Sequence, residues 1–127
     1  MATKDILPLG EERSVRWAPR TLDTLRGFPE AVRWVMGRGL YKAQIGKRHK
    51  GAAAMKGRLG GVVEIKTEAE SDAYRLYYTL KCPGTVEVLH AHKKKSKKRG
   101  RLRPADRDLI HRRYRAAIRR CREREDR

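Results

Sequence analysis

Alternating apolar and polar residues mark the middle of the chain as a set of β-strands. The segment 73–81 (AYRLYYTLK) alternates with the period of two that a strand requires. This alternation predicts one face with Tyr74, Leu76, Tyr78 and Leu80 and another with Arg75, Tyr77 and Thr79. Segments 59–66 (LGGVVEIK) and 86–92 (VEVLHAH) are rich in β-formers, and Pro83-Gly84 supplies a turn before the latter. We therefore expect three consecutive antiparallel strands, with Gly60-Gly61 as a bulge or a close backbone approach.

Helical spacing appears on both sides of this strand region. Thr21 is a suitable N-cap for a short first helix, and Pro29 suits the first position of a second helix that should end near Gln44. Residues 14–17 favour a short strand, and 45–54 a basic connection. Pro104 opens a last helix with an apolar stripe made of Ile110, Tyr114, Ala117, Ile118 and Cys121.

The resulting order, β-α-α-β-β-β-α, predicts an α+β fold. We expect a small, mostly antiparallel sheet with the helices packed on one face. A chain of 127 residues suits one domain over 13–127, including the arginine-rich C-terminal helix. Residues 1–12 show no sustained period and are predicted to be a flexible N-terminal arm.

The charge of the chain points to a polyanionic partner. Lys and Arg number 33 against 15 Asp and Glu, a formal net charge of +18. A dense cluster follows the last strand: Lys93, Lys94, Lys95, Lys97, Lys98, Arg99, Arg101 and Arg103. Nucleic acid or an acidic protein would neutralise such a charge, whereas a merely solvated basic loop would show the same pattern.

Location and redox state follow from what the sequence lacks. No apolar run approaches the roughly 18 residues of a membrane span, and no signal-peptide core is present, so we expect a cytoplasmic protein without a membrane partner. Cys82 and Cys121 form no CxxC pair and are predicted to be reduced packing residues.

Arg75 is the first candidate for chemistry, because it is a charged residue inside the strongest strand, on the face opposite Leu76. In an antiparallel sheet Lys66 and His90 or His92 could lie beside it, giving a basic face with no obvious carboxylate. Such groups suit RNA cleavage by the RNA's own 2′-hydroxyl, which needs proton transfer and cations but no metal. A phosphate-binding surface without turnover would use the same residues. His90-x-His92 lacks a third ligand at recognisable spacing, so no metal or cofactor is expected.

These segments resemble a known family. GGVVEIK, AYRLYYTL and LKCPGTVEVLHAHKKKSKK, with FPEAVRW before them, are similar over about residues 14–120 to type II toxin–antitoxin toxins of the RelE/ParE superfamily. The HigB-like branch of phage-related proteins is the most similar. The resemblance implies a RelE-like fold and a ribosome-dependent endoribonuclease, an mRNA interferase that inhibits translation and is neutralised by a co-transcribed antitoxin.

The resemblance also implies a set of site residues. The catalytic candidates are Arg75, Lys66, His92, Lys94 and Lys95. The resemblance also implies Lys56 on the same basic face, and the basic stretches of the chain complete the candidates for RNA or ribosome binding: Lys56, Arg58, Lys93, Lys97, Lys98, Arg99 and Arg101. This chain departs from the family pattern at His92, where Phe is usual, at Lys66, where Arg is common, and in its longer basic cluster.

Partners and alternatives follow from the same resemblance. The expected partners are a helix-turn-helix antitoxin, mRNA and ribosomal RNA, with operator DNA reached through the antitoxin in a higher-order complex. The alternatives are a ParE-like gyrase inhibitor, which binds a protein and has no nuclease chemistry, and a non-enzymatic basic protein that binds RNA or the ribosome. The lysine-rich end of the last strand favours the nuclease.

Overall fold

Five strands form a single sheet in the order β1-β5-β4-β3-β2. The computed structural model describes residues 12–94 and 102–125. The strands are β1 (Ser14–Trp17), β2 (Ala52–Ala54), β3 (Val62–Ala69), β4 (Asp72–Thr79) and β5 (Thr85–Lys94). β1 runs parallel to β5, and every other neighbouring pair is antiparallel. The α+β class and the mostly antiparallel sheet are therefore confirmed. The proposed arm 1–12 lies almost wholly outside the described residues.

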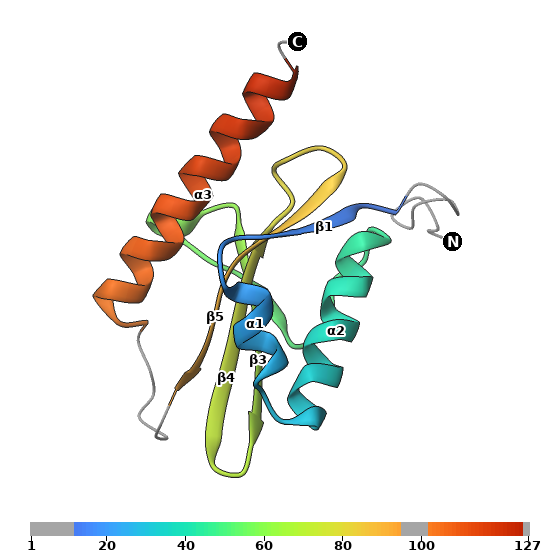
Figure 1. The fold of residues 1–127 in the computed structure, drawn as a ribbon, viewed down its shortest axis with the longest axis vertical. Coiled ribbons are helices and arrows are strands. Elements are labelled where there is room, and N and C mark those ends of the chain that lie inside the picture. The colour runs from blue at the N-terminus through green and yellow to red at the C-terminus, as the bar shows by residue number, and fades with distance from the viewer. Residues whose placement is uncertain (1–11, 95–101, 126–127) are drawn as a thin grey trace.

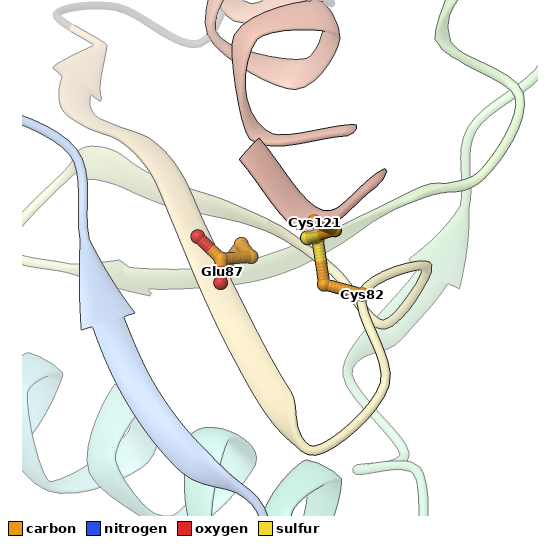
Figure 2. A group of neighbouring side chains, drawn as sticks. All are labelled: Cys82, Glu87 and Cys121. Atoms are coloured by element: carbon orange, nitrogen blue, oxygen red, sulfur yellow. A yellow bond between two sulfur atoms is a disulfide. The ribbon is translucent and has the colours of Figure 1, made fainter. Parts of the chain in front are cut away.

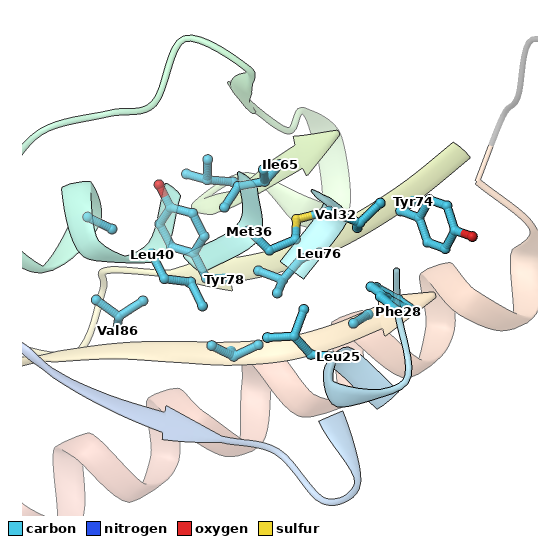
Figure 3. Close-up of a cluster of buried hydrophobic side chains, with 14 residues drawn as sticks. Leu25, Phe28, Val32, Met36, Leu40, Ile65, Tyr74, Leu76, Tyr78 and Val86 are labelled. Atoms are coloured by element: carbon cyan, nitrogen blue, oxygen red, sulfur yellow. The ribbon is translucent and has the colours of Figure 1, made fainter. Parts of the chain in front are cut away.

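One face of the sheet carries the larger core. Helices α1 (Thr21–Arg26) and α2 (Glu30–Gln44) cover it, and α2 ends at the residue that the sequence predicted. Figure 3 shows side chains from α2, such as Met36, pointing toward Leu76 and Ile65 of the central strands. All three are completely buried. The alternation of apolar residues therefore directs Val63 and Ile65 of β3, and Tyr74, Leu76 and Tyr78 of β4, into this core.

The opposite face is covered by α3 (Pro104–Glu125), as Figure 1 shows. This corrects the prediction that all helices pack on one face. The predicted polar face of β4 contains Tyr77, which is fully buried beside Val62 and Leu89. Those side chains give the apolar stripe of α3, with Ile110 and Ala117, a surface on which to pack.

A β-bulge in β5 shapes this second face. Tyr77 lies opposite His90, while the next residue, Tyr78, lies opposite Val88, so Leu89 is the extra residue. The bulge allows Leu89 to join the core beneath α3 while His90 stays beside Tyr77. The irregularity thus separates an apolar half of this face from a polar half.

A disulfide fixes the C-terminal half of α3 to the loop before β5. Cys82 and Cys121 have Cα atoms 5.6 Å apart and joined sulfur atoms, next to the buried Glu87 (Figure 2). The prediction that both cysteines pack in the core is confirmed, whereas the prediction that they are reduced is wrong. Their separation of 39 residues in sequence hid their proximity.

The connection between α2 and β3 is more structured than expected. Strand β2 lies within residues 45–54, which were predicted to be a basic connection. A short 3₁₀ helix, η2 (Gly57–Leu59), ends at the first residue of the predicted strand 59–66. Gly61 follows with φ +99°, and a Cβ atom there would collide with the Tyr114 hydroxyl of α3. The predicted close backbone approach at Gly60-Gly61 is therefore confirmed at Gly61. Among the described helices, none is long and apolar enough to cross a membrane.

Candidate functional site

Three predicted site residues form one row across the sheet. Lys66 of β3 lies opposite Arg75 of β4, and Arg75 lies opposite His92 of β5. Lys94 follows two residues after His92, so the alternation of a strand places it on the same face. We call Lys66, Arg75, His92 and Lys94 the basic row. Lys66 is exposed and the other three are half-buried, because the row lies beyond the apolar patch that α3 covers.

Aromatic rings form a stack next to the basic row. The rings of His90 and His92 lie 5.2 Å apart at 15°, and the Tyr77 ring is 5.7 Å from that of His92. The Tyr77 hydroxyl and His92 Nε2 are 3.0 Å apart, within hydrogen-bonding distance. Because Tyr77 is fully buried, this contact holds the half-buried imidazole of His92 in a defined position.

The structure corrects the prediction that no carboxylate belongs to this face. Glu64 of β3 accepts a hydrogen bond from Arg75 at 3.4 Å. Asp106, in the first turn of α3, lies 3.0 Å from His90 Nε2 and accepts a hydrogen bond from Arg103 Nε, also at 3.0 Å. Glu64 thus holds Arg75 of the basic row, and Asp106 connects α3 to His90 beside that row. This face therefore carries mostly cationic side chains, and two carboxylates hold some of them in position.

Burial determines the protonation of the two imidazoles. Burial is the main cause that lowers the pKa of His92 to about 4; the charges of His90 and Arg75 act in the same direction, and Asp106 opposes them. Burial also lowers the pKa of His90, although its hydrogen bond to Asp106 acts the other way. Both rings are therefore neutral near pH 7 and can accept a proton.

The neighbouring groups are shifted as well. Burial, followed by the charge of Glu64, raises the pKa of Tyr77 far above its ordinary range, so this hydroxyl keeps its proton. Burial and the charge of Arg75 lower the pKa of Lys94. Burial would raise the pKa of Asp106, but its hydrogen bonds with Arg103 and His90 outweigh burial and lower it. The site therefore contains a fixed anion, a neutral donor and neutral imidazoles.

The three predicted RNA-binding residues that the structure describes, Lys56, Arg58 and Lys93, do not form one surface. Lys93 pairs with Tyr74 across the sheet and makes an ion pair with Asp72 at 3.1 Å, so it lies on the α1 and α2 face. Lys56 is exposed before η2. Arg58 makes an ion pair with Asp108 of α3 at 3.2 Å. The other RNA-binding candidates lie outside the described residues: Lys97, Lys98, Arg99 and Arg101. The catalytic candidate Lys95 lies outside them as well.

Four side chains of the site were not among the predicted site residues, namely Glu64, Tyr77, Arg103 and Asp106, although Arg103 had been counted in the basic cluster. Tyr77 was assigned to the correct face of β4, and its spacing of two residues from Arg75 was the available signal. Glu64 has the same spacing from Lys66 in β3. Asp106 lies in the first turn of α3, and its proximity to His90 depends on where α3 packs.

Comparison with known proteins identifies the family. The model of the phage-derived Gp49-like proteins (DUF891) matches residues 23–115. The chain therefore belongs to the Gp49-like family, a RelE/HigB-type toxin family, and the resemblance seen in the sequence is confirmed at this level. A chain of the RelBE2 toxin–antitoxin complex from Mycobacterium tuberculosis is similar at 16% identity, covering 65% of this chain and 99% of that one, with a TM-score of 0.46. The search of curated proteins gave no match.

Proposed function

We propose that this protein is the toxin of a type II toxin–antitoxin system and that it cleaves mRNA on the translating ribosome. The observation that carries the proposal is the basic row, which collects one arginine, one imidazole and two lysines from three strands. Three cations around one imidazole suit a phosphodiester, whose transition state gains negative charge. Membership of a RelE/HigB-type toxin family supports the same reaction class.

The proposed reaction uses the RNA itself as the nucleophile. The 2′-oxygen attacks the adjacent phosphorus, the bond from phosphorus to the 5′-oxygen breaks, and a 2′,3′-cyclic phosphate forms. His92 takes the proton of the 2′-hydroxyl, and the leaving 5′-oxygen receives a proton from Lys66 or Lys94. No metal is required for these transfers.

Arg75 is proposed to hold the phosphate. Its guanidinium presents several N–H donors in a plane, and Glu64 at 3.4 Å limits its orientation from one side. The Arg75 side chain is 12% exposed, so the cation is positioned before the RNA arrives. Such preorganised charge stabilises a transition state more than a mobile surface lysine does.

The remaining partners are proposed on the same grounds. An antitoxin would neutralise the basic surface, and in a higher-order complex it would connect the toxin to operator DNA. Ribosomal RNA would provide a polyanionic surface for a chain with a formal charge of +18. We propose that these events occur in the cytoplasm, where translating ribosomes are found.

The test compares parent protein and Arg75→Ala after brief induction in cells, with primer extension on cellular mRNA. The parent should arrest growth and produce new 5′ ends, and a co-expressed antitoxin should relieve the arrest. Arg75→Ala should lower cleavage by about 10²–10³-fold, the typical cost of removing one preorganised stabiliser. Arg33→Ala, an exposed arginine on α2, is the matched control and should cut at the parental rate.

Three results would contradict the proposal. Normal growth of cells that contain soluble parent protein would show that the protein is not a toxin. Growth arrest without new 5′ ends, together with inhibition of purified gyrase, would establish the ParE-like alternative. Parental cleavage by a normally melting Arg75→Ala variant would show that the basic row is not the active surface.

A further inference from the structure

A second chemical capacity appears where β5 meets the start of α3. We infer that His90, His92 and Asp106 form a binding site for one divalent transition-metal ion of the zinc class. One ligand atom from each residue lies within 4.8 Å of the others. The sequence showed only the His90-x-His92 pair, and packing of α3 against the sheet supplies the third ligand.

The geometry is close to what an ion requires. His90 and His92 are two residues apart on one strand, so both rings project from the same face, and their planes differ by only 15°. Asp106 Oδ1 already lies 3.0 Å from His90 Nε2. A tetrahedral ion with bonds of about 2.0–2.1 Å separates its ligand atoms by roughly 3.3 Å. Small side-chain rotations would therefore bring the three atoms to bonding distance.

Neighbouring groups already hold these ligands in place. Arg103 Nε donates to Asp106 Oδ2, which leaves Oδ1 directed at His90. The buried Tyr77 ring stacks against both imidazoles, at 6.2 Å from His90 and 5.7 Å from His92. Hydrogen bonds and packing of this kind around metal ligands fix ring orientation and raise affinity. Asp106 is itself only 7% exposed, so the carboxylate is held rather than solvated.

The ligand set selects the class of ion. Two imidazole nitrogens and one carboxylate oxygen suit zinc, cobalt, nickel or copper, with one position open to water. Magnesium and calcium prefer a shell of oxygen ligands, which these residues do not supply. The charges of Arg75 and Arg103 oppose any cation, and this favours ions that form strong bonds to imidazole. A second grouping, Cys82, Glu87 and Cys121, is unsuitable because its sulfur atoms are joined in the disulfide.

The site has a consequence that rests on the proposed function. An ion bound to His92 would occupy the nitrogen that the proposed reaction needs as its proton acceptor. Zinc is therefore expected to inhibit RNA cleavage rather than to assist it.

The test is a titration of untagged, chelator-treated protein with CoCl₂, followed in the visible spectrum, and with ZnCl₂ by calorimetry. We expect one ion per chain and the absorption bands of a four-coordinate cobalt site. His90→Gln and His92→Gln should each weaken binding by more than about tenfold, since even loss of a group behind a ligand costs 10–100-fold. The chain has only four histidines, so His49→Gln and His111→Gln are complete matched controls and should bind like the parent.

Asp106→Asn is the third ligand variant, but its loss could also disturb the start of α3. The two histidine variants therefore decide the matter, with near-UV circular dichroism to confirm that each is folded. No saturable binding by the parent, or parental affinity in folded His90→Gln, would overturn the inference. Because the readout contains no RNA, this outcome is independent of whether the protein cleaves mRNA.

Discussion

The two faces of the sheet are built for different purposes. Toward α1 and α2, one apolar core joins both helices to the central strands and includes Leu25, Met36, Leu76 and Ala91. Toward α3, an apolar patch around Tyr77 and Leu89 gives way along the same strands to the basic row. One face therefore determines the fold, whereas the other combines packing with exposed chemistry. Residues that stabilise the fold and residues of the basic row thus alternate within the same strands, β4 and β5, instead of lying in separate domains.

The largest expected effect on stability comes from the α1 and α2 face. Leu76→Ala should lower the free energy of unfolding by about 2–5 kcal/mol, because Leu76 is completely buried and truncation leaves a cavity. Chemical denaturation measures this change. Cleavage per folded molecule should stay at the parental rate, since Leu76 points away from the basic row. A folded Leu76→Ala protein with impaired cleavage would show that the two faces are not separable.

Removal of the disulfide tests how firmly α3 is held on the other face. Reduction should lower the free energy of unfolding by about 3–4 kcal/mol, from the loop entropy of a 39-residue closure. Melting with and without reductant measures the loss. The double variant Cys82→Ala/Cys121→Ala should be insensitive to reductant, which makes it the control. If the melting temperature of the parent protein does not change with reductant, packing alone holds α3 on the sheet.

A smaller effect concerns the pH dependence of stability. Folding lowers the pKa of His92 from 6.5 to about 4, so the unfolded chain binds this proton more tightly. Stability should be complete above about pH 6.5 and should decline as the pH falls toward 4. His92→Phe should reduce the dependence of the melting temperature on pH between about pH 4 and 6.5. Some dependence should remain, because the pKa of His90 is also lowered. An unchanged slope in His92→Phe would place the titrating group elsewhere.

Sequence patterns predicted the elements well where local chemistry determines them. The alternation in β4 assigned Arg75 and Tyr77 to one face. Antiparallel order placed Lys66 and either His90 or His92 beside Arg75, and the structure selects His92. The end of α2 at Gln44 followed from its helical spacing. These features depend on patterns within a strand or helix, or on the pairing of strands that follow one another in the chain.

The predictions were wrong for features that depend on packing between segments far apart in the sequence. A buried tyrosine and an exposed one have the same place in an alternating pattern, so Tyr77 did not reveal that α3 covers it. The position of α3 then brings Asp106 to His90 and Cys121 to Cys82, across 16 and 39 residues of sequence. The extra strand β2 is three alanines long and carries no strong strand propensity of its own.

Lys93 and Lys94 offer the most direct test of the central claim, because they are adjacent lysines of β5 on opposite faces. Lys94 belongs to the basic row, whereas Lys93 makes its ion pair with Asp72 on the α1 and α2 side. The measurement is the single-turnover rate of mRNA cleavage on programmed ribosomes. We predict that Lys94→Ala cuts about tenfold or more slowly, less than the loss for Arg75→Ala because neighbouring lysines partly replace it. Lys93→Ala should cut at nearly the parental rate, and a larger loss in Lys93→Ala than in Lys94→Ala would contradict the account.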